Sequence, residues 1–306
     1  MTEAIIFVLI GLVGLSVGGE WLVTGAVGIA QRLGISSLVT GLVIVGAATS
    51  MPEMVASVQA VIAGSPEIAW GNIAGSNIAN SLLILGATAV VAPIILTGLG
   101  RRDAVVALIV SVLVFAIAAA QLASPFIGFA LLVLLVVYIV WRMQNPRPDD
   151  EEDLDEQPPL WRTLLFFVMG LAALVLGGKL LVDGAIEIAT IAGISETVIG
   201  LTIVAIGTSL PELAASIAAA LKGKAGLAVG NVVGSNIYNL LLIGGVTMSI
   251  APFPVPRELV DMELPLVAGT ALLILLLCFF APRISRWMGA VLLAGFAAFN
   301  IVLFVQ

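Results

Sequence analysis

The stretch IGTSLPELAAS, residues 206–216, returns almost unchanged as AATSMPEMVAS at residues 47–57. Each copy places a glutamate, Glu212 or Glu53, directly after a proline and inside a long apolar run. Proline has no N–H and breaks the helical hydrogen bond to the residue four positions earlier. A charged residue at membrane depth costs about 3 kcal/mol on insertion scales and usually faces a bundle interior or a wet cavity. The two copies therefore predict one polar site built from two similar halves.

The composition is that of a polytopic membrane protein. Of the 306 residues, 61% are hydrophobic and only 10% are charged, far from the balance of a soluble domain. Apolar runs of spanning length predict an all-α integral membrane protein with ten transmembrane helices in a lipid bilayer. The expected helices cover residues 4–30, 38–62, 68–93, 103–121, 125–142, 163–190, 197–220, 226–250, 259–281 and 286–305. We interpret the first as a retained helix, because no basic n-region or cleavage site precedes it.

Further matches show that the whole chain is duplicated. Residues 18–36, 41–53 and 71–80 align without gaps with residues 177–195, 200–212 and 230–239, all at an offset of 159. One constant offset over about sixty positions indicates an internal repeat. Five spans per repeat is an odd number, so the second copy enters the membrane inverted. Inverted repeats are typical of secondary transporters, whose sites lie at the repeat interface.

The repeats are separated by an acidic segment. We expect a first repeat at 1–142, a linker at 143–162 and a second repeat at 163–306. Residues 149–156 (DDEEDLDE) contain most of the local charge and indicate a solvated linker. A calcium-sensing role for this segment is the less favoured alternative. No basic, aromatic-interleaved patch suggests a nucleic-acid partner.

Basic residues predict the orientation in the cell inner (plasma) membrane. With both termini outside and the linker in the cytoplasm, the outer loops hold only Arg257, and Lys179 lies within a span. The positive-inside rule favours this arrangement. The inner loops then hold Arg32, Arg101, Arg102, Arg142, Arg147, Arg162, Lys222, Lys224, Arg283 and Arg286.

The residue types point to hard cations. The chain has one cysteine and no histidine, so a bound metal must be held by oxygen. Each glutamate has a Thr and a Ser four and three residues earlier, on the same helix face. The prolines free nearby carbonyls, and such oxygens suit Na+ and Ca2+. The expected side-chain ligands are Glu53, Glu212, Thr49, Thr208, Ser50, Ser209, Ser76, Ser235, Asn80 and Asn239. For Asn72, Asn77, Asn231 and Asn236, helix packing and ligation stay equally open.

The paired GTSLPE-like and GNxxGSN motifs resemble those of the sodium/calcium exchanger family, and the resemblance covers nearly the whole chain. It implies exchange by alternating access, with Na+ influx driving Ca2+ out and with no cofactor. It also implies that main-chain carbonyls of Gly46 and Ala205 join the side chains above, and that the first and sixth helices slide across the other eight. A monomer suffices for this interpretation.

Departures from the family pattern refine the expected coupling. Potassium-dependent relatives carry an acid at the position of Asn239, so K+ independence is expected. Proton/calcium exchangers carry an acid where this chain has Gly75 and Gly234, which favours Na+ over H+. Ala48 replaces the glycine of the usual motif. H+/Ca2+ exchange and a passive cation channel stay open as alternatives, whereas an enzyme or an ATP-driven pump is not expected.

Overall fold

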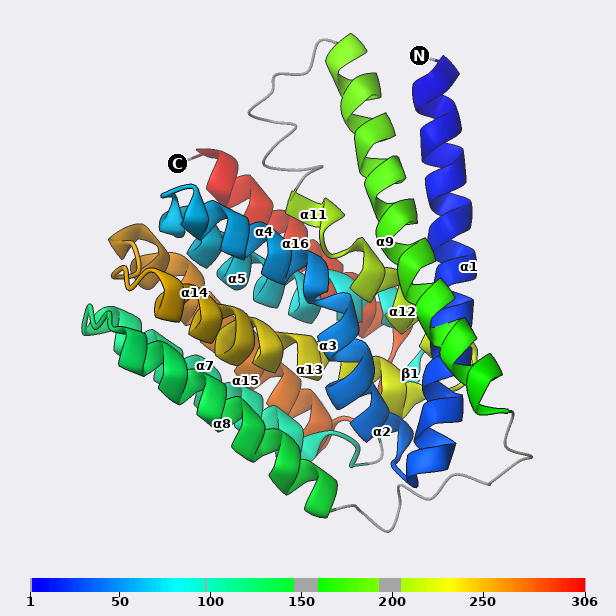
Figure 1. The fold of residues 1–306 in the computed structure, drawn as a ribbon, viewed down its shortest axis with the longest axis horizontal. Helices are drawn as coiled ribbons and strands as arrows, with labels where there is room; N and C mark the ends of the chain where they lie inside the picture. The colour runs from blue at the N-terminus through cyan, green and yellow to red at the C-terminus, as the bar shows by residue number, and fades with distance from the viewer. Residues whose placement is uncertain (1, 97, 146–158, 193–204, 306) are drawn as a thin grey trace.

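The computed structural model describes residues 2–96, 98–145, 159–192 and 205–305. The first half of the chain is helical apart from one two-residue strand (Figure 1). Its elements are α1 (Thr2–Leu33), α2 (Ser37–Val39), η1 (Thr40–Val45), α3 (Gly46–Thr49), α4 (Met51–Ile62), α5 (Pro66–Ala79), η2 (Asn80–Ile84), α6 (Leu85–Val91), β1 (Ile94–Ile95), α7 (Arg101–Ala119) and α8 (Pro125–Gln144), where η marks a π-helix.

The second half has a similar succession of helices, but its strand lies directly before the last helix and it contains an additional π-helix, η6. Its described elements are α9 (Leu160–Ile191), α11 (Ala205–Gly207), α12 (Leu210–Leu221), α13 (Ala225–Tyr238), η5 (Asn239–Ile243), α14 (Gly244–Ile250), η6 (Leu259–Glu263), α15 (Leu264–Phe280), β2 (Arg283–Ile284) and α16 (Arg286–Val305).

These elements confirm a helical membrane protein. Within the described residues, eight helices are long and apolar enough to cross a membrane, and the bent pair Ser37–Thr49 and Met51–Ile62 makes a ninth. The expected span at 197–220 is described only from residue 205 onward, where it contains the shorter apolar helix Leu210–Leu221. The full count of ten therefore stays a prediction, as do the repeat boundaries, since most of the acidic linker lies outside the described residues.

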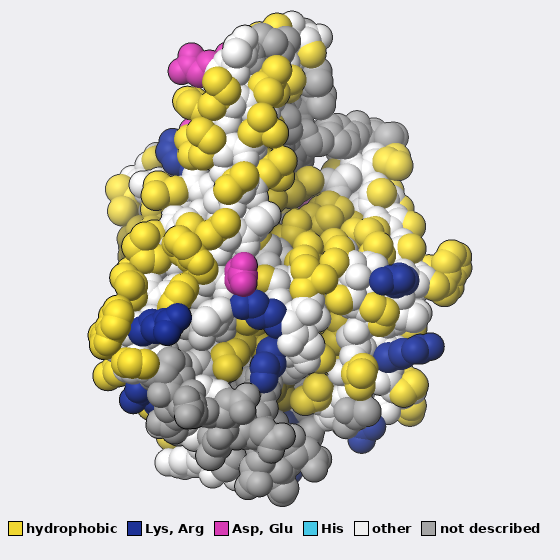
Figure 2. Space-filling model, turned by 90° about the vertical axis from the view of Figure 1, so that its right-hand side faces the viewer, with side chains coloured by type: hydrophobic (Ala, Val, Ile, Leu, Met, Phe, Trp, Pro, Cys, Tyr) yellow, Lys and Arg dark blue, Asp and Glu magenta, His cyan; other side chains and the backbone are white. Residues whose placement is uncertain are grey.

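Burial separates central helices from peripheral ones. The α5–α6 and α13–α14 segments are the most enclosed: 78% and 94% of the residues in their most apolar 18-residue stretch are buried. The long helices α1 and α9 are only 28% and 22% buried by the same measure. Figure 2 shows hydrophobic side chains spread over the face that α1 and α9 form, with most of the visible Lys and Arg side chains in its lower half. An exposed apolar face of this kind suits contact with lipid.

Helices α1 and α9 pack antiparallel along most of their length, side by side at one edge of the bundle (Figure 1). The contact depends on glycine, because a Cβ atom on Gly11 would lie 2.6 Å from the backbone nitrogen of Leu181. A Cβ on Gly18 would lie 2.8 Å from the nitrogen of Leu174. Close backbone approach through small residues is the usual way for helices to associate in lipid. The seam follows glycines that recur in both repeats, at positions 11, 18 and 25 and at 170, 177 and 184.

A short antiparallel strand pair departs from the purely helical prediction. Ile94 pairs with Ile284 and Ile95 with Arg283, which joins the end of α6 to the start of α16. Nearby, Arg101 donates from Nε to the carbonyl of Cys278 at 3.0 Å, at the C-terminal end of α15. An arginine there satisfies a carbonyl that the helix leaves free and complements the helix dipole. The apolar patterns of these segments carry no signal for the strands, because the pairing joins residues far apart in the chain.

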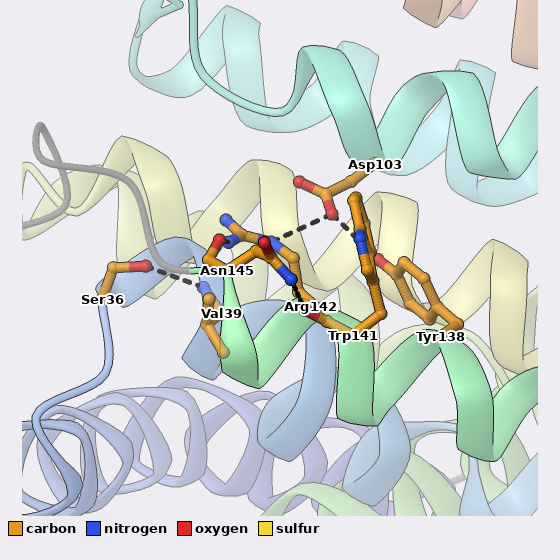
Figure 3. Close-up of polar contacts among 7 residues, drawn as sticks. All are labelled: Ser36, Val39, Asp103, Tyr138, Trp141, Arg142 and Asn145. Atoms are coloured by element: carbon orange, nitrogen blue, oxygen red, sulfur yellow. Dashed lines mark hydrogen bonds and ion pairs between the residues drawn. The ribbon is translucent and has the colours of Figure 1, made fainter.

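Arg142, which the topology prediction counts among the inner-loop residues, lies within a helix end. Arg142 lies in the last turn of α8, is buried, and pairs through Nε with Asp103 Oδ1 of α7 at 3.1 Å (Figure 3). The Tyr138 hydroxyl donates to the same carboxylate oxygen at 3.0 Å. A buried ion pair holds its place when further hydrogen bonds satisfy its partners. The cluster fixes α8 against α7 just before the acidic segment.

The glycine seam generates a stability prediction. We expect Gly11→Ala to lower the thermal unfolding temperature in detergent, because the new methyl group would meet the α9 backbone. Overpacking of this kind costs about 1–3 kcal/mol. The matched control is Gly269→Ala in α15, where an added Cβ meets nothing within 4 Å. Equal unfolding temperatures for the two variants would show that the seam is not tightly packed.

Candidate cation-binding site

Both repeats contain a helix break at the same position. In the first, α3 ends at Thr49 and α4 begins at Met51, with Ser50 between them and an axis change of 42°. In the second, Ser209 directly precedes α12 with nearly the same backbone angles, φ −90° and ψ 4° against φ −80° and ψ 5° at Ser50. Each proline thus falls in the first turn of a new helix, where its missing N–H costs no hydrogen bond.

The breaks place both acids at helix N-termini in the protein interior. Glu53 and Glu212 lie in the first turns of α4 and α12 and are 1% and 2% exposed. The unpaired N–H groups and the positive end of the helix dipole stabilise a carboxylate there. The bend is what allows an acid in the middle of a span to sit at a helix end.

Each carboxylate is contacted by a serine from the opposite repeat. The Ser50 hydroxyl donates to Glu212 Oε1 at 3.3 Å, and the Ser209 hydroxyl donates to Glu53 Oε1 at 3.4 Å. These four residues are therefore brought together directly, as the repeated motif predicts. Neither repeat holds its own acid in place alone, so the site is a product of the interface between the two.

Two asparagines on the following helices, α5 and α13, hydrogen-bond to the residues just after the helix breaks. Asn72 Nδ2 donates to the Glu53 carbonyl at 3.2 Å and to Ser57 Oγ at 2.9 Å. Asn231 Nδ2 donates to the Glu212 carbonyl at 3.2 Å and to Ser216 Oγ at 2.9 Å. The equal distances reveal the internal symmetry of the fold. For these two asparagines the structure thus gives a supporting contact, which spacing alone left open. Their distant partners were not apparent from the motif.

Several buried oxygens near these contacts accept no hydrogen bond. Both Oε2 atoms of the glutamates are buried without a partner, as are Thr208 Oγ1, Ser235 Oγ and Asn239 Oδ1. A buried polar atom without a partner costs about 1–3 kcal/mol, so native proteins keep few of them. An oxygen-bound cation satisfies such atoms, and carboxylate, hydroxyl and amide oxygens are the donors that Na+ and Ca2+ take. The donor set fits these ions.

The second expected motif lies on helices α5 and α13. Ser76 and Asn80 are buried, and Ser235 and Asn239 occupy the matching places. Asn80 and Asn239 each begin a π-helix, η2 and η5. Single π-helical turns occur often at functional sites, because they change which side chains and carbonyls face inward. The sequence carried no signal for these turns beyond the asparagines themselves.

The remaining expected ligands differ between the repeats. The Thr49 hydroxyl donates to the Val45 carbonyl at 3.0 Å and lies 3.2 Å from Asn231 Oδ1, whereas Thr208 Oγ1 has no partner. The Gly46 carbonyl accepts the Ser50 N–H at 3.1 Å, which leaves its second lone pair for a cation. Its counterpart Ala205 begins α11 at the edge of the described residues.

Thr208, the threonine without a partner, borders a cavity next to α9. This cavity has a volume of about 220 Å³ and lies between α9 and the second helix break. Its core wall includes Pro52, Thr208 and Pro211, and its α9 wall includes Gly178, Lys179, Val182 and Asp183. A methyl group on Gly207 would lie 2.5 Å from Val182 Cγ2. Glycine is thus required where α9 passes, while the first repeat carries Ala48 at the same place.

The site is made of two carboxylates and neutral oxygens. No group of three or more acidic or cysteine side chains that could hold a metal occurs in the parts of the chain that are described. Buried half-sites that meet between two inverted repeats, in a helical membrane protein, define a secondary transporter of small cations.

The family follows from comparison with known proteins. A family model described as sodium/calcium exchanger protein matches residues 3–144 and 162–305, so the chain belongs to the sodium/calcium exchanger family. It is a membrane antiporter and not an enzyme. A protein described as an antiporter, CaxA of Alkalimonas amylolytica, is 39% identical over 320 residues, covering 99% of each chain.

Two further relatives extend the comparison. The sodium/calcium exchanger MaX1 of Methanosarcina acetivorans is 31% identical over 347 residues, again covering 99% of each chain. The solved structure of the sodium-calcium exchanger NCX_Mj, soaked with zero Na+ and Ca2+, is 32% identical and has a TM-score of 0.84. That match covers 99% of this chain and 98% of NCX_Mj.

The paired carboxylates generate a stability prediction. In cation-free detergent, we expect Glu212→Gln to raise the thermal unfolding temperature, because a buried carboxyl group costs more to remove from water than a neutral amide of similar size. We also expect it to remove the stabilisation that Ca2+ gives the unmodified protein, which is about 2.7 kcal/mol at 100-fold above Kd. The control is Glu67→Gln, an exposed acid in the first turn of α5. Undiminished stabilisation of Glu212→Gln by Ca2+ would place the cation elsewhere.

Proposed function

We propose that this protein exchanges Na+ for Ca2+ across the membrane. The observation that supports this proposal is the pair of contacts between the repeats, Ser50 with Glu212 and Ser209 with Glu53. Each glutamate also has a buried oxygen without a hydrogen-bond partner. Two carboxylates supply a charge of −2, which one Ca2+ neutralises. Several Na+ ions distributed over neighbouring oxygens neutralise it as well. Two loaded states of similar energy are what exchange requires, and the names of the relatives MaX1 and NCX_Mj agree with these ions.

The ligands in this proposal are the expected twelve. The glutamates, with Ser50 and Ser209, bind the divalent ion, and Thr49, Thr208, Ser76, Ser235, Asn80, Asn239 and the carbonyls of Gly46 and Ala205 complete the subsites. Thr208 borders the 220 Å³ cavity beside α9, whereas both glutamates are buried, so cations enter from the α9 side only after this helix moves.

The identity of the coupling ion is inferred from positions where this chain has a neutral residue and related exchangers have an acid. Asn239 is buried with an amide where an acid would add the negative charge that K+ dependence requires, so the exchange is K+-independent. Gly75 lies in open space, with nothing within 4 Å of an added Cβ, and Gly234 packs against Leu42. Neither supplies a carboxylate for proton exchange. Proton coupling through Glu53 and Glu212 themselves is the competing mechanism.

The transport cycle uses the two peripheral helices. The glycine seam joins α1 and α9 into one unit, and both are poorly buried against the remaining helices. We propose that this unit slides across the core and opens the site to one side at a time. In the cell, the chain works as a monomer in the inner membrane, with both termini outside and the acidic linker in the cytoplasm. The basic side chains gathered on one half of the face in Figure 2 support this orientation.

Transport in proteoliposomes tests the proposal. With Na+ inside and none outside, the unmodified protein should accumulate 45Ca2+, while inside K+ or a pH gradient alone should not drive uptake. Glu53→Gln and Glu212→Gln should each reduce uptake at least tenfold, because each removes one of the two charges that balance Ca2+. Glu67→Gln serves as the exposed-acid control.

Each ion condition separates one alternative. Uptake driven by a pH gradient without Na+ would replace sodium by proton coupling. Flux that needs no counter-ion would indicate a channel. Full activity of both glutamine variants would overturn the site assignment while leaving the family membership intact.

A further inference from the structure

Equivalent helices contact the core unequally. A Cβ atom on Gly19 of α1 would lie 2.9 Å from the Ala214 carbonyl of α12 and 3.2 Å from Ala218 Cβ. Gly178 occupies the same repeat position in α9, yet its nearest core atom would be Leu210 Cβ at 3.8 Å. Helix α1 is therefore closely packed on α12, while α9 at Gly178 leaves more space to α12 beside the 220 Å³ cavity, although it contacts the core at Gly207.

The matching seat for α9 is empty and has a different shape. By the offset of 159, Val55 and Gln59 of α4 correspond to Ala214 and Ala218 of α12. Both are exposed, Val55 by 54% of its surface, whereas the two alanines are half-buried under α1. Valine and glutamine are also larger than alanine, so α9 cannot approach α4 as closely as α1 approaches α12. The two seats favour the conformation in which α1 is docked.

A lysine adds a polar bridge on the docked side only. Lys222, the C-cap of α12, donates to Thr24 Oγ1 at 2.7 Å and to the Glu20 carbonyl at 3.1 Å, and lies 3.9 Å from Glu20 Oε1. Its repeat counterpart is Ala63, which cannot make such a bridge. The α9 residues matching Glu20 and Thr24 are Lys179 and Asp183, and these pair with each other at 3.1 Å within their own helix.

A cavity borders this bridge further along α1. A cavity of about 360 Å³ separates the next turns of α1 from the end of α12, and Val23, Val27, Gln31, Lys222 and Lys224 are among its lining residues. Figure 2 shows an acidic side chain directly beside basic ones near the middle of this face. Beyond Gly19, the Lys222 ammonium thus adds a polar contact between the core and α1 to the apolar packing of Val23 and Ala26 with Ala219.

We propose that Lys222 is a positioning residue that holds α1 against α12 and biases the protein toward the conformation described here. The proposal rests on the sliding of α1 and α9 in the proposed transport cycle. Lys222, Glu20 and Thr24 form a latch that opens once per cycle, and the opposite conformation has no equivalent latch. The unequal seats on α12 and α4 act in the same direction.

The test measures the distance between α1 and α12 without any ion gradient. Spin labels are placed at Leu33 and Leu221, two exposed residues at the ends of these helices, in a Cys278→Ala background. We expect one short distance in the parent protein and a second, longer one in Lys222→Ala. The ratio of long to short should rise about two- to fivefold, the range for an exposed polar pair. Lys222→Arg should restore the parent distribution.

Two further variants sharpen the test. Lys179→Ala removes the lysine whose partner lies in its own helix, so it should leave the distances unchanged. Val55→Ala combined with Gln59→Ala gives α4 the side chains of α12 and should raise the longer population without touching Lys222. An unchanged distribution in Lys222→Ala, or an equal shift in Lys179→Ala, would overturn the latch. Failure of the parent protein to exchange ions would instead overturn the proposed function and leave the distance result standing.

Discussion

Two carboxylates buried close together repel each other when both are charged. Hydrogen bonds between the two repeats stabilise them. Glu53 depends on Ser209, and Glu212 depends on Ser50, so each half of the chain supplies what the other half lacks. The helix breaks follow from the same constraint, because they bring helix N-termini to the acids at the centre of the molecule. Asn72 and Asn231 then fix the geometry of the breaks from a neighbouring helix. The remaining oxygens without partners suit a cation that arrives and leaves.

Much of this arrangement could be predicted because the same motifs occur in both halves of the sequence. The constant offset of 159 residues identifies the repeats, and the Pro–Glu pairs identify the breaks, since proline and a charge in an apolar run each have few physical explanations. The family comparison confirms the transporter class and the structure confirms the helical membrane fold. The ligand roles stay predictions, although Ser50, Ser209 and both glutamates are in direct contact as expected.

What could not be predicted depends on partners distant in the chain. The Arg142–Asp103 pair, the strand pair and the Lys222 bridge all join residues whose local sequence carries no sign of a partner. The π-helices that begin at Asn80 and Asn239 leave no sign in the hydrophobic periodicity of the sequence. The repeated motif also does not predict that equivalent residues of the two repeats make different contacts. Thr49 and Thr208 occupy the same position in the two repeats, yet Thr49 hydrogen-bonds to Val45, whereas Thr208 Oγ1 has no partner.

The glycine seam has a consequence for how such a chain could arise. Glycines 11, 18 and 25 in α1 have counterparts 170, 177 and 184 in α9, and the antiparallel packing brings the two sets together. The contact surface is thus self-complementary, as in a twofold symmetric dimer. A single five-helix protein that inserted in both orientations would already possess this surface and pair with itself. Fusion of two gene copies would then fix the stoichiometry and allow the halves to diverge, as Ala48 and Gly207 have.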